Sequence, residues 1–335
     1  MKVFEIQEFG IDKLALVDRE KPVPGPGQAL VRMLAASLNY RDYMMVGGVY
    51  NPRLKRPMVP LSDGVGVVEE VGSGVTRVKK GDRVAACFFQ KWIEGPPSRE
   101  KSNSALGGSI DGVAAEYALF SEDGLVQAPA SLSDEEVAAL PCAGVTAWHA
   151  LFGHAGTVPG DTVLLQGTGG VSIFALQFAV LAGLRTIIIS SSDEKIAHAR
   201  KLGAHETINY KTTPNWDEAA RKLTGGEGVD HIIEVGGSNT LARSMKALRT
   251  HGAISVIGVL GGADAAITPV SLLVSSARIQ GIFVGSRNMF EQMNRAIEFH
   301  KVKPAIDQTF EWTYLKEALR YMESQRHFGK ICLKF

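Results

Sequence analysis

The sequence has few cysteines and almost no net charge. Its three cysteines among 335 residues, Cys87, Cys142 and Cys332, are widely spaced and odd in number. This spacing excludes a disulfide framework and a paired-cysteine metal knuckle, and it favours a reducing compartment. The 36 lysine and arginine residues nearly balance 35 aspartates and glutamates, so the formal charge of +1 offers no net attraction to phosphate polymers or anionic lipid. We therefore expect neither a nucleic-acid nor a membrane partner.

The sequence also lacks an apolar run of the length that a membrane span requires. Acidic residues interrupt the start of the chain, MKVFEIQEFG, whereas a signal peptide needs an uninterrupted apolar stretch. No later run reaches the roughly 18 apolar residues that cross a bilayer. We therefore predict a cytoplasmic protein.

The composition is that of a folded protein with an excess of glycine. Hydrophobic residues make up 45% of the chain, which is ample material for a core. At roughly 150 residues per domain, the length indicates two lobes. Glycine accounts for 36 of the 335 residues, about 11% against an average near 7%. The positions of these glycines are therefore informative.

The pattern of apolar and polar residues changes after about residue 125. Before it, short apolar runs such as ALVRMLAAS (29–37) and GVGVVEEVG (64–72) are separated by glycine and proline, which is typical of a β-rich lobe. After it, apolar strands alternate with helical segments, which predicts an α/β domain with a doubly wound parallel sheet. The expected strands include 162–166, 186–190, 229–235, 253–259 and 277–285, and the expected helices include 170–183, 193–203, 239–248 and 287–300.

A glycine-rich turn follows the first strand of the α/β region. The strand TVLLQ leads into Gly167-Thr168-Gly169-Gly170-Val171-Ser172 and then into a helix. The first glycine permits a tight turn, the second permits close approach of a pyrophosphate, and the helix N-terminus supplies free N–H groups. A third glycine is replaced by the small Ser172. Because a whole βα series surrounds the turn, we predict dinucleotide binding by residues 167–171.

The end of the second α/β strand bears on cofactor choice. An acidic residue there would bind the ribose 2′-hydroxyl of NAD, but this chain has Ser190-Ser191-Ser192, with Lys195 one turn later. Hydroxyl groups and an ammonium group suit a 2′-phosphate. A helix N-cap followed by a solvated lysine explains the same residues nearly as well. Asp193 argues against a phosphate unless it serves the start of the helix.

Together these motifs resemble the medium-chain dehydrogenase/reductase superfamily, in particular its zinc-free quinone oxidoreductase and enoyl reductase branch. The resemblance implies a GroES-like catalytic domain formed by residues 1–125 and 286–335, and a Rossmann domain formed by residues 126–285. It also implies a homodimer that pairs edge to edge through residues 277–285. The segments that carry it are AASLNYRDYMMVGGVY (35–50), PLSDGVGVVEEVGSGVTRVKKGDRV (60–84), LPCAGVTAWHAL (140–151), QGTGGVSIFALQFA (166–179), KLGAHETINY (201–210) and VDHIIEVGG (229–237).

The resemblance also implies which residues contact the cofactor. In the quinone reductase branch, a small residue, a lysine and a tyrosine surround the 2′-phosphate, at positions that match Ser191, Lys195 and Tyr210. This favours NADPH over NADH. The implied nicotinamide contacts are Thr146, Gly258, Val259, Phe283 and Val284.

The positions that match the zinc ligands of other superfamily members argue against a metal. Those members carry a cysteine, a His-Glu pair and a second cysteine where this chain has Asn39, Ser62-Asp63 and Cys142. Only Cys142 is a normal soft ligand, Asp63 is a possible oxygen ligand, and a zinc site needs three protein ligands. The four cysteines of their structural zinc lobe have no counterpart near residues 90–110. We predict no zinc.

Without a metal, hydrogen-bond donors must stabilise the charge that develops on a substrate oxygen. Hydride addition to an enone or quinone leaves a delocalised anion, which an amide or hydroxyl donor can stabilise. The resemblance implies Asn39 and Tyr50 as candidates, although a turn-stabilising asparagine and a packed loop tyrosine are the structural alternatives. We predict an NADPH-dependent reductase of quinones or α,β-unsaturated carbonyls. A zinc-free alcohol dehydrogenase or aldehyde reductase, and a dinucleotide-binding protein without turnover, remain open alternatives.

Overall fold

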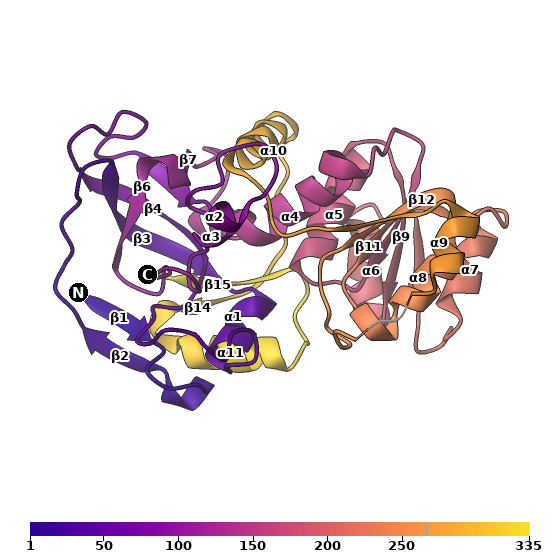
Figure 1. The fold of residues 1–335 in the computed structure, drawn as a ribbon, viewed down its shortest axis with the longest axis horizontal. Helices are drawn as coiled ribbons and strands as arrows, with labels where there is room; N and C mark the ends of the chain where they lie inside the picture. The colour runs from indigo at the N-terminus through magenta and orange to yellow at the C-terminus, as the bar shows by residue number, and fades with distance from the viewer. Residues whose placement is uncertain (265–266) are drawn as a thin grey trace. The chain divides into compact units, whose positions relative to one another are not determined.

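The computed structural model describes residues 1–264 and 267–335 and divides the chain into two compact units. Unit 1 contains Met1–Val145 and Gly285–Phe335, and unit 2 contains Thr146–Val284. The indigo first part of the chain and its yellow last part therefore belong to one unit (Figure 1).

Unit 1 is built around a mostly antiparallel sheet in the order β14-β15-β3-β4-β5-β7, with β6 paired to β3. Close strand packing explains part of its glycine content, because a Cβ atom on Gly66 would lie 2.3 Å from the carbonyl oxygen of Arg32. A separate hairpin pairs β1 with β2. The strands are β1 (Lys2–Glu5), β2 (Ala15–Asp18), β3 (Gln28–Ser37), β4 (Asp63–Val71), β5 (Arg83–Ala86), β6 (Tyr117–Ser121), β7 (Leu125–Gln127), β14 (Ile306–Glu311) and β15 (Lys330–Lys334).

The helices of unit 1 include the helix start that the sequence indicates at Ser133. The Ser133 hydroxyl accepts a hydrogen bond from the Glu136 N–H, and the Glu136 carboxylate accepts one from the Ser133 N–H, which forms a capping box. The helices are α1 (Tyr40–Val46), α2 (Arg99–Ser102), α3 (Asp134–Ala138), α10 (Arg287–His300) and α11 (Leu315–Glu323), with a π-helical stretch at Leu140–Gly144.

The structure divides the chain later than residue 126, the predicted start of the Rossmann domain. The structure places residues 126–145 in unit 1, because α3 packs against β3, β4 and β15. The Ser37 hydroxyl also donates to the carbonyl oxygen of Ala138 at 2.9 Å. The predicted end of the Rossmann domain at residue 285 differs from the end of unit 2 by one residue, since Gly285 belongs to unit 1.

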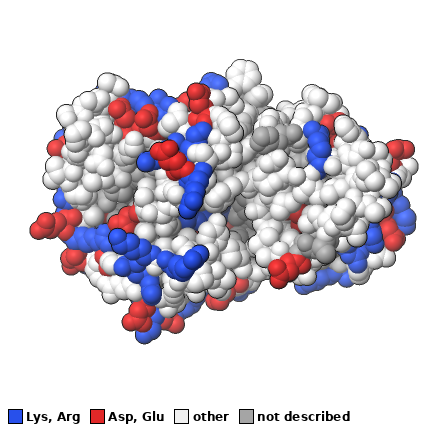
Figure 2. Space-filling model, in the orientation of Figure 1, with Lys and Arg blue, Asp and Glu red and all other residues white. Residues whose placement is uncertain are grey.

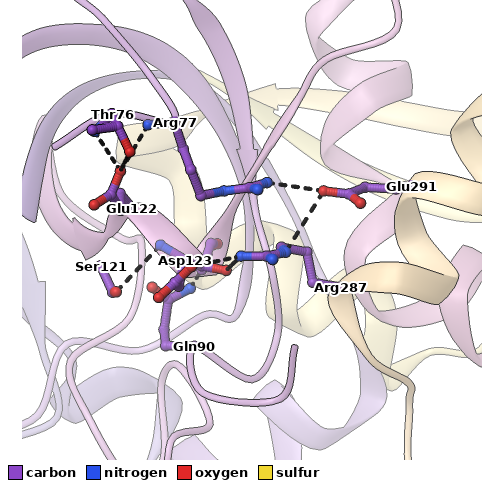
Figure 3. A network of polar contacts seen from close by, with 9 residues as sticks. Thr76, Arg77, Gln90, Ser121, Glu122, Asp123, Arg287 and Glu291 are labelled. Carbon is purple, nitrogen blue, oxygen red and sulfur yellow. Dashed lines mark hydrogen bonds and ion pairs between the residues drawn. The ribbon is translucent and has the colours of Figure 1, made fainter. Parts of the chain in front are cut away.

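Ion pairs anchor the segment with which the chain returns to unit 1 (Figure 3). At the start of α10, the mostly buried Arg287 donates to the Asp123 carboxylate at 2.8 Å and to the Asp123 carbonyl oxygen at 2.9 Å. One turn later, Glu291 accepts a hydrogen bond from Arg77 at 2.9 Å. These contacts join the returning helix to two loops far away in the sequence: Asp123 lies between β6 and β7, and Arg77 lies between β4 and β5.

Unit 2 has the doubly wound parallel sheet that the sequence predicts. Its strand order is β10-β9-β8-β11-β12-β13, so the winding reverses direction between β8 and β11. Every residue of β8 is buried, which explains its continuous apolar run. The strands are β8 (Thr162–Gln166), β9 (Arg185–Ser190), β10 (Glu206–Asn209), β11 (Val229–Glu234), β12 (Leu248–Val256) and β13 (Arg278–Gly281). The helices are α5 (Gly170–Leu181), α6 (Asp193–Lys201), α7 (Trp216–Leu223), α8 (Leu241–Ala247) and α9 (Pro269–Ser275). They are preceded by a π-helical stretch at His149–His154 and by α4 (Val145–Trp148), which begins at the last residue of the first segment of unit 1.

The surface mixes charges of both signs, as the near-zero net charge suggests. On the face drawn in Figure 2, basic and acidic side chains are interspersed among larger uncharged areas. Within the part of the chain that the structure describes, every helix is too short or too polar to cross a membrane.

Candidate functional site

The predicted phosphate-binding turn lies at the carboxyl end of β8, where the strand order of unit 2 reverses. Gly167 has a φ of +72°, a left-handed conformation that side-chain-bearing residues rarely adopt. A Cβ atom on Gly167 or on Gly169 would meet nothing within 4 Å, so the space in front of both backbones is open. Gly169 is the N-cap of α5 and brings no side chain to this space. Open space at a glycine-lined helix N-terminus fits a dinucleotide pyrophosphate, which Gly167 to Val171 would hold.

Ser172, which replaces the third glycine of the motif, has a role that its small size alone does not indicate. Its buried hydroxyl donates to the carbonyl oxygen of Gln166 at 2.6 Å. The side-chain amide of Gln166 donates in turn to Glu234 at 2.7 Å, and its oxygen accepts from the Val235 N–H at 3.2 Å. Ser172 thus ties the helix end of the turn to Gln166 at its strand end, and Gln166 is in turn fixed to Glu234 at the end of β11 and to Val235 after it.

Glu234 is a functional candidate that the sequence analysis missed. Its fully buried carboxylate ends β11 and accepts hydrogen bonds from five donors. These donors fix the loop that follows β11, at the sheet edge where ligands bind in doubly wound folds. They are the side chains of Gln166, Thr240 and Ser244 and the backbone N–H groups of Gly236 and Gly237. Because the donors lie on several different segments, no short motif reveals this group.

The end of β9 carries the residues predicted to select the cofactor. Ser191 and Lys195 are half-buried, and the exposed Tyr210 follows β10, where its N–H donates to the Ser190 carbonyl oxygen at 3.0 Å. Asp193 accepts a hydrogen bond from the side chain of Asn209 at 2.7 Å, so this carboxylate already has a partner. The Ser192 hydroxyl accepts a hydrogen bond from the Lys195 N–H and so caps the start of α6. This is the helix N-cap that the structural alternative for these serines expects.

Gly258 and Val259 follow β12. The Leu260 N–H donates to the Val235 carbonyl oxygen at 3.1 Å, which holds this segment against the loop after β11. Val259 remains 46% exposed. The structure thus brings these two predicted nicotinamide contacts to the same sheet edge as Glu234.

The other predicted nicotinamide contacts lie at the two ends of unit 2. Thr146 and Val284 are buried, whereas Phe283 is half exposed. Val284 has a φ of +55°, which is unusual for a β-branched residue, and its carbonyl oxygen lies 2.6 Å from Nδ1 of the buried His149. His149 therefore has a structural partner.

In unit 1, the candidate Tyr50 follows α1 at the surface. Its side chain is 42% exposed, and the Arg41 guanidinium lies 5.7 Å from its ring centre. Within residues 1–264 and 267–335, its hydroxyl has no hydrogen-bond partner. Burial of part of the ring raises the pKa of the Tyr50 hydroxyl, while Arg41 opposes this shift. The tyrosine therefore stays protonated at neutral pH and can donate a hydrogen bond.

The other candidate, Asn39, belongs to a closed ring of four hydrogen-bonding side chains. Lys330, at the start of β15, donates to Asn39 Oδ1 at 2.6 Å. Asn39 Nδ2 faces Ser62 Oγ at 3.4 Å, and Ser62 Oγ donates to Asp63 Oδ1 at 2.8 Å. Asp63 Oδ2 lies 3.8 Å from Lys330 Nζ, which closes the ring. Lys330 is a second residue that the sequence analysis missed.

This ring occupies the positions that match the zinc ligands, and its chemistry does not fit a divalent cation. Asp63 Oδ1 and Oδ2 already accept hydrogen bonds from Ser62 and from the Cys142 N–H, and a buried ammonium group stands beside them. Burial raises the pKa of the Cys142 thiol, which disfavours the thiolate that zinc requires. Among the described residues, no group of three or more His, Cys, Asp or Glu side chains is arranged to hold a metal.

Two family models match the chain. The one described as alcohol dehydrogenase GroES-like domain matches residues 25–130, and the one described as zinc-binding dehydrogenase matches residues 170–298. The second match lies entirely after Cys142, so it includes none of the four positions that correspond to zinc ligands.

Relatives of known sequence carry the names of different oxidoreductases. A zinc-type alcohol dehydrogenase-like protein of Schizosaccharomyces pombe is 47% identical over 332 residues, which is 97% of this chain and 96% of the relative. A quinone oxidoreductase of Rattus norvegicus is 30% identical over 91% of this chain and 89% of the relative.

Solved structures agree with the fold over the whole chain. The crystal structure of a putative alcohol dehydrogenase from Sinorhizobium meliloti has a TM-score of 0.93 and 40% identity, and it covers 100% of this chain and 98% of its own. A mycobacterial protein complexed with NADPH has a TM-score of 0.84 and 25% identity, with 100% of both chains covered. The GroES-like and Rossmann-type fold classes predicted from the sequence are thereby confirmed.

Proposed function

Since the chain belongs to the medium-chain dehydrogenase/reductase superfamily, an oxidoreductase family, we propose that it reduces quinones or α,β-unsaturated carbonyls with NADPH and without a metal. Bound NADPH would supply a hydride to the conjugated system of the substrate. Residues 167–171 would hold the pyrophosphate, while Asn39 and Tyr50 would donate hydrogen bonds to the substrate oxygen as it gains charge. Solvent would then protonate the resulting anion.

The observation that carries this proposal is the hydrogen-bonded ring in unit 1. At the positions where zinc-dependent relatives hold their metal, this chain has an amide, a hydroxyl and a carboxylate that satisfy one another, with the Lys330 ammonium group as the cation of the ring. Such a group offers hydrogen-bond donors instead of a Lewis acid. Donors suffice most easily where the developing charge is delocalised, as it is in an enolate or a quinol anion.

The choice of NADPH is supported by the end of β9. Ser191, Lys195 and Tyr210 offer hydroxyl groups and a positive charge to a 2′-phosphate. Asp193 is engaged by Asn209 at 2.7 Å, which reduces its capacity to accept the 2′-hydroxyl of NAD.

A metal-removal experiment tests the proposal. Protein dialysed against a zinc chelator should reduce an enone with NADPH at the rate of untreated protein, and added zinc should not raise this rate. Loss of activity that one equivalent of zinc per chain restores would contradict a metal-free mechanism.

The names of several relatives favour a second candidate activity. Because the Schizosaccharomyces pombe relative is named as alcohol dehydrogenase-like, interconversion of alcohols and simple aldehydes without zinc is the alternative reaction. A saturated aldehyde offers no conjugation, so it would demand stronger stabilisation of the oxygen by the same donors.

We also propose a homodimer that forms through residues 277–285. The strand β13 lies at the edge of the six-stranded sheet and pairs only with β12 in the described chain. Its residues are largely exposed, so its free edge is available to a second copy.

A further inference from the structure

We infer that Lys330 is a positioning residue that fixes the Asn39 amide as a hydrogen-bond donor to the substrate oxygen. The inference rests on the proposed function, since it concerns the donor that this function requires. Lys330 itself would act only through Asn39, without contact with the substrate.

The ammonium group of Lys330 determines which end of the Asn39 amide faces the ring. It donates to Asn39 Oδ1 and to the Leu38 carbonyl oxygen, both at 2.6 Å. An ammonium group has three donors and no acceptor, so only the oxygen of the amide can face it. The donors of Lys330 therefore fix which atom of the Asn39 amide points towards the ammonium group.

The nitrogen of Asn39 consequently faces away from Lys330, towards the side chains of Ser62 and Asp63. Ser62 Oγ donates its hydrogen to Asp63 at 2.8 Å and accepts from Asn39 Nδ2 at 3.4 Å. This contact uses one of the two amide hydrogens. The Asp63 carboxylate also forms a hydrogen bond with the Asn39 side chain. Because Asn39 is only half buried, a substrate oxygen that gains negative charge would compete with Asp63 for this hydrogen.

Asp63 holds Lys330 in place. Lys330 is 3% exposed and Asp63 is fully buried, with Lys330 Nζ and Asp63 Oδ2 at 3.8 Å. Asp63 Oδ2 is itself fixed by the Cys142 N–H at 3.1 Å. The ring thus contains one positive and one negative charge, which compensate each other in a buried site.

A cation bound to the amide oxygen also strengthens the amide as a donor. Charge-assisted hydrogen bonds polarise the groups that they join, so the Asn39 N–H becomes a better partner for an oxygen that gains negative charge. The ring therefore gives Asn39 both a fixed direction and increased polarity. Removal of Lys330 abolishes the added polarity and leaves the amide oxygen held only by the capping box at the start of α1.

The test is the rate of enone reduction in the Lys330→Met variant. Removal of one donor to a developing oxyanion lowers kcat by about 10²- to 10³-fold, so the loss of its positioning group should lower kcat by about 10- to 100-fold. KM should change by less than about twofold, because the interaction strengthens only as charge develops. In an Asn39→Ala background, Lys330→Met should cause no further loss of kcat. A further loss as large as in the wild-type background would overturn the inference.

Two control variants separate positioning from folding. Lys330→Met alone leaves Asp63 without its counter-charge, so the Lys330→Met/Asp63→Asn double variant should unfold at a higher temperature than the single variant. Its kcat should nevertheless stay low, whereas recovery of kcat would show that Lys330 has only a structural role. Lys334→Met, on the exposed end of the same strand, should leave kcat unchanged.

A spectroscopic readout distinguishes failure of this inference from failure of the proposed function. The side-chain amide resonances of Asn39, assigned by their absence in Asn39→Ala, should shift in Lys330→Met and stay in place in Lys334→Met. This comparison needs no substrate. Unchanged Asn39 resonances in Lys330→Met would refute the positioning role even if the enzyme reduces enones.

Discussion

Asp42 is a fully buried carboxyl group in the first turn of α1. One oxygen accepts a hydrogen bond from the Asn39 N–H at 2.8 Å, and the other has no hydrogen bond within the described chain. Burial raises the pKa of Asp42 from 3.8 to about 6, although Arg41 opposes the shift. This carboxyl therefore binds a proton more tightly in the folded chain than in the unfolded one.

The sign of this shift predicts a pH dependence of stability. The stabilising contribution of Asp42 is fully present below about pH 4 and is lost as the pH rises through about 6. Asp42→Asn removes this dependence, so between pH 4 and pH 7 the variant should gain about 3 kcal/mol relative to the wild type. Denaturant unfolding at several pH values measures the difference. Parallel stability curves for the two proteins would contradict the prediction.

Lys195 offers a test of the cofactor assignment. If it binds the 2′-phosphate, Lys195→Ala should lower kcat/KM for NADPH by about 10- to 100-fold, as loss of one charge-assisted hydrogen bond implies. The value for NADH should stay nearly constant. Lys201→Ala, at the other end of α6, is the matched control. An unchanged ratio between the two cofactors in Lys195→Ala would reject the assignment.

At the level of elements, Glu234 joins β11 to the loop that follows it and to β8. Glu234→Gln replaces an acceptor oxygen by a donor that faces other donors. We expect the free energy of unfolding to fall by about 2–4 kcal/mol, because buried donors lose their partner. The dissociation constant for the dinucleotide should rise as the loop after β11 loosens. Wild-type stability in this variant would contradict the role that the hydrogen bonds indicate.

The edge strand β13 offers a test of the proposed homodimer. Gln280→Asp would bring like charges together where two copies of this strand meet, so the dimer dissociation constant should rise roughly tenfold. Analytical ultracentrifugation measures this change. Gln308→Asp, on the edge strand β14 of unit 1, is the matched control. A dimer that tolerates Gln280→Asp as well as Gln308→Asp would place the interface elsewhere.

Elements with local signals were predictable from the sequence. The helix expected at 287–300 is found as α10 (Arg287–His300), because Ser286 caps its start and Lys301 ends it in a left-handed conformation. The turn at 167–171 was equally visible, because its glycines adjoin a strand and a helix. The packing of residues 126–145 in unit 1 was not predictable from the sequence. The capping box marks the start of α3 but gives no sign of the sheet on which that helix packs.

The hydrogen-bonded ring could not be predicted for a related reason. Asn39 and Asp63 lie in segments that the resemblance singled out, but Lys330 reaches them only because β15 pairs with β3. A lysine near a chain end has no sequence signal that separates a buried partner from a solvated one.

For the whole molecule, we propose that the two units of the split chain divide the tasks of a reductase. Unit 2 would provide the glycine turn for the dinucleotide, and unit 1 would provide the Asn39 amide and the Tyr50 hydroxyl as donors. Both donors are uncharged groups, which suits a substrate whose developing charge spreads over a conjugated system.

NADPH consumption against a quinone, an enone, an enoyl thioester and a saturated aldehyde is the decisive measurement of the proposed activity. We predict the highest kcat/KM for a conjugated substrate, with the aldehyde slower by at least about tenfold. Rapid turnover of the aldehyde without turnover of any conjugated substrate would contradict it and favour an alcohol dehydrogenase. Tight NADPH binding without turnover of any of the four would favour a dinucleotide-binding protein that is not a reductase.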